Sequence, residues 1–473
     1  MKKFNFLMYF LLVLIVKTTA QVPYTQELFE VRIDTNINYG IATNYAGNQV
    51  SLLLDIYKPI ADNNTKRPIL VLVHGGAWIS GSKDEVEIQN LAQLFAKRGY
   101  VVAAINYRLG MHPSASGGSN TATCSLVTPQ ANCVYVADSA EVVRAIYRGM
   151  QDVKGAIRFM KGRTEIDSTC SENTYLSGVS AGGFCSLAAA FMDVETEKPL
   201  PTFAIEEAEQ PANSLNYCHT YFNETNATIS RLRPDLGNLE GTIALNNTTS
   251  NVKGVANFYG GMLTNLFNQF EGESPLLYLF HQTADVVVNC GRAPILSSLS
   301  YNCLAPFGFL GCNHIWNMPW SSGSCSINEL LTSSSETVQV QDAIVNNGSP
   351  NCLIEPAGHS ILNATQRVNE ITNFFGVRIA ATELSGCENS VGIEEIQKTV
   401  KLFPNPANEQ LHVSVEFVFY KMEITDIHGR VLMTKITDEK MVIFETAFLA
   451  KGLYFLNCYT SSSEKIVTKW LHN

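Results

Sequence analysis

The sequence lacks any excess of positive charge. Its 473 residues include 33 Lys and Arg against 43 Asp and Glu, which gives a formal net charge of −10. A protein that binds nucleic acid needs a basic face or stripe to neutralise phosphate groups, and nothing in the chain resembles one. We therefore expect no nucleic acid among its partners.

Long apolar runs are also scarce. The only one, Phe4–Val16, follows Lys2 and Lys3 and precedes the small residues Thr18-Thr19-Ala20. A charged start, a short apolar stretch and a small-residue site are typical of a secretory signal. We interpret residues 1–20 as a signal peptide that is cleaved after Ala20, and we expect no transmembrane segment after cleavage. An N-terminal membrane anchor is the alternative, although the run is short for a bilayer span.

Metal-binding cysteine pairs are lacking as well. None of the twelve cysteines forms a CxxC spacing, and we expect neither a metal nor another cofactor. Twelve cysteines in an exported chain indicate disulfides instead, with a connectivity that the sequence leaves open. Cys124 and Cys133 bracket a short loop and could pair locally, whereas Cys185 is predicted to be a buried helix residue. Four other cysteines lie in a Gly/Ser/Pro-rich stretch and indicate an insertion that is cross-linked by disulfides: Cys290, Cys303, Cys312 and Cys325.

The length of the chain exceeds that of one typical compact domain. From about residue 40 to residue 378, apolar runs alternate with helical patterns, which predicts an α/β fold with a mostly parallel sheet and helices on both faces. We place this domain at 21–379 and a polar linker at 380–398. Short alternating strands and turn signals at 399–473 predict a small C-terminal β-sandwich.

The alternation of the larger domain predicts individual elements. The expected strands are Ser51–Ile56, Ile69–His74, Tyr100–Asn106, Thr174–Val179, Val252–Tyr259, Leu276–His281 and Asn351–Glu355. The expected helices are Asp84–Arg98, Ser139–Met160, Ala181–Met192 and Thr365–Phe375. Two stretches break this rhythm, at about 193–251 and 289–347. Insertions after strands of such sheets often build the substrate site. The alternative for each stretch is a surface loop without a function.

The most informative motif is Gly178-Val179-Ser180-Ala181-Gly182, which follows an apolar strand. A serine on a sharp strand-to-helix turn is exposed as a nucleophile, and glycines beside it give the backbone room. Far upstream, His74-Gly75-Gly76-Ala77-Trp78 follows another strand, and such a loop offers backbone N–H groups to a developing oxyanion. Either motif could occur by chance, but both together in this order predict a serine hydrolase.

A nucleophilic serine needs a base, and the base needs an orienting carboxylate. In this type of fold the acid follows a late strand and the histidine follows the last one. These positions hold Asp285 and His359. His281 is the alternative base, although we expect it to shape the turn that carries Asp285. Four other candidates are less suitable. Glu271 and Glu273 precede a strand, Asp342 has no strand before it, and His314 lies in the Cys-rich insertion.

Several segments together resemble a known family. They are HGGAWISG at 74–81, Asn106-Tyr107-Arg108, GVSAGG at 178–183, the turn at 281–285 and Gly358-His359. As a set, spread over residues 35–378, they resemble the α/β-hydrolase carboxylesterases of the HGG type, which include esterase/lipase and feruloyl-esterase-like enzymes.

The resemblance implies a role for each matching residue. Ser180 would be the nucleophile, His359 the general acid and base, and Asp285 its orienter. The oxyanion hole would be formed by the backbone N–H groups of Gly76, Ala77 and Ala181. Ala77 stands where many relatives have a third glycine, a change that keeps the backbone donor. Trp78 would line the pocket and bind substrate.

The C-terminal segment has a resemblance of its own. Its motifs are Leu402–Ala407, Ile427–Val431, Lys451–Tyr454 and the terminal Lys465–Lys469, and together they resemble the sorting domain of the type IX secretion system. The resemblance implies that the secretion machinery is a partner. It also implies passage through the periplasm of a gram-negative bacterium to the medium or the cell surface. A carbohydrate-binding β-sandwich is the alternative.

These observations predict a secreted serine carboxylic ester hydrolase that acts through an acyl-enzyme. Its substrate would be a small-molecule or polymeric ester of the acylated polysaccharide, aromatic or polyester type. Trp78, Trp316 and Trp320 suit any of these. An amidase or peptidase on the same scaffold is one alternative, since it would use the same residues. A surface binding protein without catalysis is another.

Overall fold

The computed structural model divides the chain into two compact units, residues 1–390 and 391–473. The structure describes residues 22–111, 139–205, 233–246, 248–267, 273–297, 318–333, 338–349, 358–385, 387, 400–415, 421–427, 429–437, 439–459 and 465–472. The expected signal peptide lies outside these ranges. None of the helices within them is long and apolar enough to cross a membrane.

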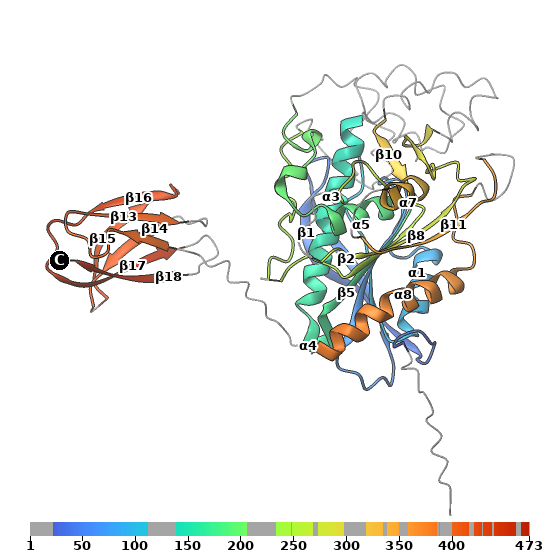
Figure 1. Ribbon diagram of the computed structural model, residues 1–473, viewed down its shortest axis with the longest axis horizontal. Helices are drawn as coiled ribbons and strands as arrows, with labels where there is room; N and C mark the ends of the chain where they lie inside the picture. The colour runs from blue at the N-terminus through green and yellow to red at the C-terminus, as the bar shows by residue number, and fades with distance from the viewer. Residues whose placement is uncertain are drawn as a thin grey trace, which may run out of the picture. The chain divides into compact units, whose positions relative to one another are not determined.

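The amino-terminal unit is built on an eight-stranded sheet in the order β1-β2-β4-β3-β5-β6-β8-β11 (Figure 1). Its strands are β1 (Val31–Thr43), β2 (Gln49–Pro59), β3 (Arg67–Val73), β4 (Val101–Ile105), β5 (Thr169–Val179), β6 (Gly254–Phe258), β8 (Leu276–Gln282) and β11 (Val340–Val345). Strand β2 pairs antiparallel with β1 and β4, and every later pair is parallel. The predicted α/β-hydrolase fold class, with its mostly parallel sheet, is confirmed.

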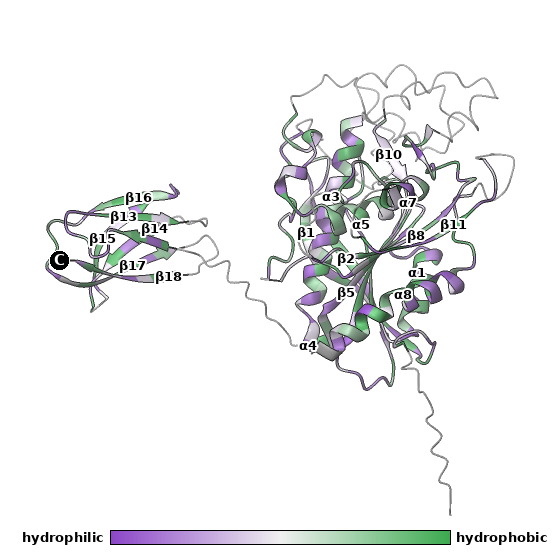
Figure 2. Cartoon of the chain, in the orientation of Figure 1, coloured by the Kyte–Doolittle hydropathy of each residue, from purple (hydrophilic) through white to green (hydrophobic). Residues whose placement is uncertain are grey.

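Helices cover both faces of this sheet. Helices α3 (Ser139–Lys161) and α5 (Ala181–Phe191) pack on one face, and α1 (Val86–Ala96) and α8 (Ala364–Ser385) pack on the other. Alternate residues of a strand point to opposite faces. Val71 of β3 therefore joins the core under α3 and α5, whereas Leu72 joins the core under α1 and α8. This double burial explains why the central strands are continuous apolar runs, as the hydropathy colours show (Figure 2).

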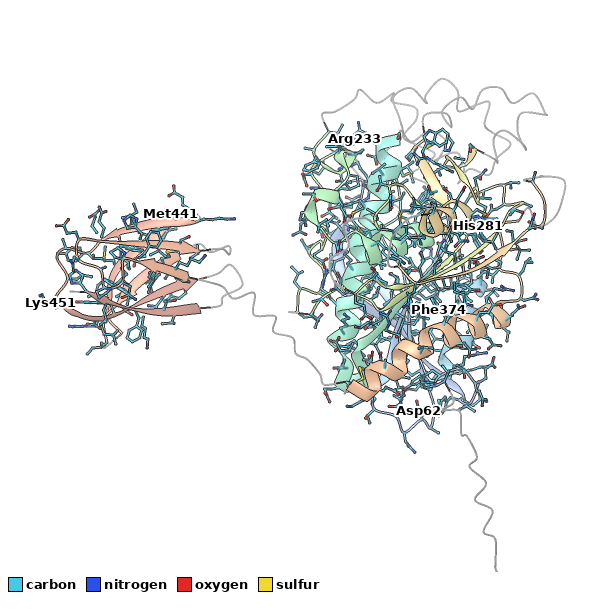
Figure 3. The ribbon with its side chains drawn as sticks, viewed as in Figure 1. Asp62, Arg233, His281, Phe374, Met441 and Lys451 are labelled. Carbon is cyan, nitrogen blue, oxygen red and sulfur yellow. A yellow bond between two sulfur atoms is a disulfide. The ribbon has the colours of Figure 1, made fainter. Side chains whose placement is uncertain are left out.

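The described part of the first predicted insertion packs against α3. It contains two short 3₁₀ turns, η2 (Glu195–Glu197) and η3 (Leu200–Thr202). Glu240 forms ion pairs with Lys154 and Arg158 of α3, and Arg233 lies 3.7 Å from Glu141 near the start of that helix (Figure 3). Buried charges on α3 thus have partners in this segment, which also contributes Leu239 and Ile243 to the apolar core.

The second predicted insertion is only partly an insertion. It contains β9 (Arg292–Pro294), β10 (Trp320–Gly323) and α7 (Ser324–Ser333), and β9 and β10 join β7 (Gly261–Met262) in a small antiparallel sheet. It also contains β11, which belongs to the main sheet, and this corrects the predicted span of 289–347. The apolar pattern of β11 is weak because it is an edge strand with no fully buried residue.

Three elements differ from the sequence-based expectations or cannot be compared with them. Strand β1 was not predicted because it is an edge strand with many exposed polar residues, and its register along β2 shifts twice. Helix α8 does not end at Phe375 but continues to Ser385, into the predicted linker at 380–398. The expected strand Asn351–Glu355 lies outside the described residues.

Among the described residues, two disulfides join distant segments of the amino-terminal unit. Cys170 at the start of β5 pairs with Cys387, 217 residues later, and Cys290 pairs with Cys325 at the start of α7. The second pair lies within the predicted Cys-rich stretch. Cys185 is buried and unpaired, as predicted. Six further cysteines lie outside the described residues: Cys124, Cys133, Cys218, Cys303, Cys312 and Cys352.

The carboxy-terminal unit is composed of two antiparallel sheets. One has the order β12 (Val400–Phe403), β13 (Gln410–Val415), β16 (Met441–Glu445), and the other has β15 (Val431–Ile436), β14 (Lys421–Thr425), β17 (Gly452–Tyr459), β18 (Lys465–His472). Alternate residues of both sheets are buried in one core, among them Val413, Phe444, Ile424 and Trp470. The predicted β-sandwich is confirmed.

The long loop closed by Cys170 and Cys387 generates a first prediction. A cross-link over so many residues restricts the unfolded chain strongly, and removing a native disulfide costs typically about 2 to 4 kcal/mol. We expect the double variant Cys170→Ala/Cys387→Ala to lose stability by that order in denaturant unfolding of the full chain. Cys458→Ala, which removes an unpaired buried cysteine of the other unit, is the control. An unchanged unfolding midpoint in the double variant would contradict the prediction.

Candidate active site

Ser180 lies on a sharp turn between β5 and α5. Its backbone is in a strained region, with φ 54° and ψ −121°, and its N–H donates to the carbonyl of Phe258 at 2.8 Å. The turn presses α5 against β3, because a Cβ at Gly182 would lie 2.3 Å from the carbonyl oxygen of Val73. Glycine is therefore required there, which explains the sequence pattern around Ser180.

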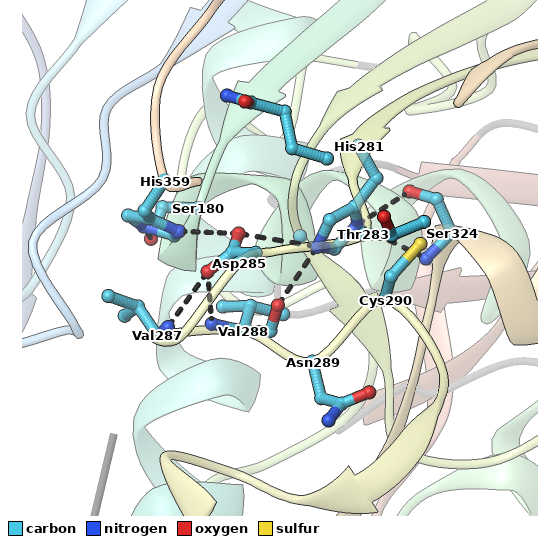
Figure 4. A network of polar contacts seen from close by, with 12 residues as sticks. Ser180, His281, Thr283, Asp285, Val287, Val288, Asn289, Cys290, Ser324 and His359 are labelled. Carbon is cyan, nitrogen blue, oxygen red and sulfur yellow. Dashed lines mark hydrogen bonds and ion pairs between the residues drawn. The ribbon is translucent and has the colours of Figure 1, made fainter. Parts of the chain in front are cut away.

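Three of the predicted site residues form one hydrogen-bonded row (Figure 4). The Oγ of Ser180 lies 2.9 Å from Nε2 of His359, and Nδ1 of His359 lies 2.8 Å from Oδ2 of Asp285. Both distances are those of hydrogen bonds. Asp285 is fully buried, while the side chain of His359 is 19% exposed. The row thus runs from a buried carboxylate to a hydroxyl nearer the surface.

The carboxylate of Asp285 is fully engaged. Its Oδ1 accepts hydrogen bonds from the backbone N–H groups of Val287 and Val288, at 2.8 and 3.0 Å. Nε2 of His281 approaches Oδ2 to 3.3 Å, on the side away from His359. Burial by itself would raise the pKa of Asp285, but the imidazoles of His359 and His281 outweigh it and hold that pKa below its usual value. Asp285 is therefore ionised at neutral pH.

The loop that carries His359 is fitted closely against the loop of Asp285. Gly358 has φ +71°, and a Cβ there would lie 2.5 Å from the backbone nitrogen of Asp285, so the position requires glycine. The ring of Tyr259 lies 4.5 Å from that of His359, and its hydroxyl donates to Glu87 at 2.9 Å. Sequence reasoning missed Tyr259 and Glu87. The available signal was that Tyr259 directly follows β6, at the same sheet edge as Ser180.

The loop after β3 passes directly beside Ser180. A Cβ at Gly75 would lie 3.1 Å from Cβ of Ser180, so no side chain separates the two segments. The following residues Ala77 and Trp78 adopt φ of 50° and 61°. The carbonyl of Gly76 accepts the N–H of Ser80 at 3.0 Å, which closes the loop into a tight turn.

A buried neutral histidine fixes this loop. His74 is fully buried, and its Nδ1 donates to the carbonyl of Gly75 at 2.7 Å. Its ring stacks on Tyr107 at 4.5 Å, and the hydroxyl of Tyr107 donates to the carbonyls of His74 and Gly75, both at 3.3 Å. Burial lowers the pKa of His74 to about 4. The imidazole is therefore uncharged near neutral pH.

Trp78 differs from expectation. Its side chain is 2% exposed and packs edge-on against Phe184 at 5.3 Å, which places it in the core and not at a pocket wall. The indole is buried because the loop turns it under α5. Phe184 instead borders a cavity of about 410 Å³ between α3, α5 and β10. The cavity is lined mostly by apolar side chains, among them Ile146, Met150, Met262, Leu200 and Trp320.

Comparison with known proteins finds a family match in each unit. Residues 54–120 match the family BD-FAE, an α/β-hydrolase family of esterases, and residues 401–473 match the secretion system C-terminal sorting domain. The amino-terminal unit thus has an α/β-hydrolase fold with a segment similar to a family of esterases, and the match of residues 401–473 to a type IX sorting domain marks a secreted or cell-surface protein.

Several solved structures are distantly similar. Esterase 2 of Thermogutta terrifontis, phosphorylated by paraoxon, is 17% identical with a TM-score of 0.37 over 73% of this chain and 94% of that one. A truncated carbohydrate esterase from gut microbiota is 15% identical with a TM-score of 0.39 over 75% and 98%. A bifunctional GH43-CE of Bacteroides eggerthii is 15% identical with a TM-score of 0.39 over 73% and 35%.

The neutral state of His74 generates a prediction about pH. A histidine whose pKa falls on folding takes up protons preferentially in the unfolded chain, so stability present at neutral pH is lost as the pH falls from 6.5 towards 4. For these two pKa values the loss is about 2 kcal/mol between pH 7.5 and pH 5. We expect His74→Gln to remove this part of the dependence in denaturant unfolding. His472→Gln, in the other unit, is the control and should leave the dependence unchanged; equal slopes for wild type and His74→Gln would refute the assignment.

Proposed function

We propose that this α/β-hydrolase is an esterase that cleaves carboxylic esters through a covalent acyl-enzyme on Ser180. The observation that supports this most directly is the row Ser180–His359–Asp285, with separations of 2.9 and 2.8 Å. Such a row is what a serine needs in order to lose its proton as it attacks. The ionised state of Asp285 suits it to stabilise an imidazolium, and its contact with Nδ1 fixes the tautomer that leaves Nε2 free to accept.

In the first half of the proposed reaction, Oγ of Ser180 attacks the ester carbonyl carbon while its proton passes to Nε2 of His359. The carbonyl oxygen becomes an oxyanion. We propose that the backbone N–H groups of Gly76, Ala77 and Ala181 bind it. Among the described residues these three groups donate no hydrogen bond within the protein. The N–H of Ala181 is also the first of helix α5, where the helix dipole favours negative charge.

In the second half, the bond between the carbonyl carbon and the alcohol oxygen breaks, and His359 returns its proton to the leaving alcohol. Water then attacks the acyl carbon while His359 accepts a proton from it. The bond between that carbon and Oγ of Ser180 breaks, His359 returns the proton to Oγ, and the carboxylic acid leaves. Because His359 alternates between base and acid, it must keep contact with both Ser180 and the leaving group. The partly exposed position of its side chain suits that role.

We propose that substrate choice depends on the segments beside the apolar cavity. Trp320 is 53% exposed and Leu200 is 83% exposed, and both border that cavity. Exposed apolar side chains around a concave apolar surface favour an ester with an aromatic or aliphatic part. Acylated polysaccharides, small aromatic esters and polyesters all have such parts. The sorting domain supports the proposal that the chain meets them outside a gram-negative cell, after export through the periplasm by the type IX machinery.

The nucleophile is tested by Ser180→Ala. We expect hydrolysis of p-nitrophenyl acetate to fall by roughly three to six orders of magnitude, the range for loss of a triad nucleophile. A fluorophosphonate probe should label the wild type at one serine and fail to label the variant. Ser177→Ala, three residues earlier on β5 and also buried, is the matched control and should keep both properties. Wild-type protein that resists the probe would favour a binding protein without catalysis.

The bond that is cleaved is tested with matched substrates. We expect the ester p-nitrophenyl acetate to be hydrolysed faster than the amide p-nitroacetanilide, because the amide nitrogen is the poorer leaving group. A faster amide reaction would favour the amidase or peptidase alternative. The substrate class is then read from a panel of short acyl esters, feruloylated and acetylated sugars, and an aromatic polyester film, with kcat/KM as the measure.

A further inference from the structure

His281 is a second histidine in contact with the carboxylate of Asp285. It lies near the end of β8, four residues before Asp285, and is fully buried. We propose that His281 is a positioning residue, which holds Asp285 and its loop in the geometry that His359 requires. This inference rests on the proposed function, since it assigns a role around the same row of residues.

The hydrogen-bond partners of His281 define its tautomer. The backbone N–H of Ser324 points at Nδ1 from 3.3 Å, and the hydroxyl of Ser324 lies 3.1 Å from the same nitrogen. A backbone N–H only donates, so Nδ1 must be the acceptor and carry no proton. The ring proton of neutral His281 therefore resides on Nε2, on the side of Asp285 (Figure 4).

The Nε2–H group reaches two acceptors on the loop of Asp285. It donates to the carbonyl of Val288 at 2.9 Å and lies 3.3 Å from Oδ2 of Asp285. The same Oδ2 accepts from Nδ1 of His359. Two imidazoles thus share one carboxylate oxygen, while two backbone N–H groups bind the other. This arrangement fixes both the position and the rotation of the carboxylate.

His281 is itself anchored by a separate element. Ser324 begins α7, and its hydroxyl accepts a hydrogen bond from Nδ2 of Asn257 at 3.2 Å. The next residue, Cys325, is disulfide-bonded to Cys290 and donates its N–H to the carbonyl of Cys290 at 2.8 Å. Cys290 lies on the same loop as Asp285. Helix α7 and the loop of Asp285 are therefore joined covalently on one side and through His281 on the other.

The titratable groups that face this carboxylate are few among the described residues. They are His281 from β8, His359 from the loop before α8, and Tyr259 after β6, whose hydroxyl is bonded to Glu87 of α1. Loss of the His281 proton donor would leave Oδ2 a stronger partner for His359. It would also weaken the stabilisation of the ionised form of Asp285. Both effects move the acid limb of a pH profile to higher pH.

Two substitutions distinguish a positioning role of His281 from a role in packing alone. His281→Asn keeps an acceptor near the place of Nδ1 but has no donor that reaches the Asp285 loop. His281→Gln reaches that loop with its amide nitrogen. The readout is the rate constant for labelling of Ser180 by a fluorophosphonate probe as a function of pH, with thermal unfolding measured in parallel on the full chain.

We expect His281→Asn to be labelled roughly 10- to 100-fold more slowly, the order expected for a displaced catalytic group, with its acid midpoint at higher pH. His281→Gln should recover most of the rate and the wild-type midpoint. Equal losses in both variants with an unchanged midpoint, or wild-type labelling of His281→Asn, would overturn the inference alone. A wild type that is not labelled at Ser180 would overturn the proposed function and this inference with it.

A milder variant decides the matter if His281→Asn does not fold. Ser324→Ala removes the hydroxyl beside Nδ1 and leaves the backbone donor. We expect slower labelling and a shift of the acid midpoint in the same direction. Ser321→Ala, three residues earlier on β10, is the matched control because, within the described part of the chain, its hydroxyl bonds only to the carbonyl of Ala293. Identical profiles for Ser324→Ala and Ser321→Ala would overturn the inference.

Discussion

Burying one negative charge is the constraint on which the rest of the site depends. The carboxylate of Asp285 is removed from water entirely, and an isolated buried charge would be protonated or would destabilise the fold. The protein compensates with four donors from three segments: two backbone N–H groups of its own loop, His281 and His359. The loops must meet at fixed distances to supply them. The position of His359, and through it the contact with Ser180, follows from that requirement.

Much of this was predictable from the sequence because local patterns have local causes. The apolar runs of β3 and β4 indicate burial on both faces, and the glycines beside Ser180 and His359 mark places where two backbones touch. The chain order of Ser180, Asp285 and His359 then predicted their convergence at one sheet edge. Edge strands were harder to predict from the sequence. Strands β1 and β11 were missed or misplaced because a half-exposed strand has no strong apolar pattern.

Contacts made across the fold were beyond sequence reasoning. Tyr259 offered one signal, its place directly after β6, and Ser324 offered none. Their contacts with His359 and His281 arise only when β6, β8 and α7 pack together. Trp78 was misread for a similar reason. Its place after two glycines suggested a pocket wall, but the indole is buried against Phe184 of α5. The pairing of Cys170 with Cys387 likewise depends on where α8 ends relative to β5.

That same pairing determines what a proteolytic cut would leave behind. Every cut between residues 170 and 387 leaves two fragments that remain joined by a covalent bond. Asp285 and His359 lie inside that span, as does Ser180, so a nicked molecule keeps all three on one cross-linked body. A cut beyond Cys387 removes the sorting domain without freeing the end of α8. The enzyme unit is thus arranged to survive trimming of its connecting segments as a two-chain molecule.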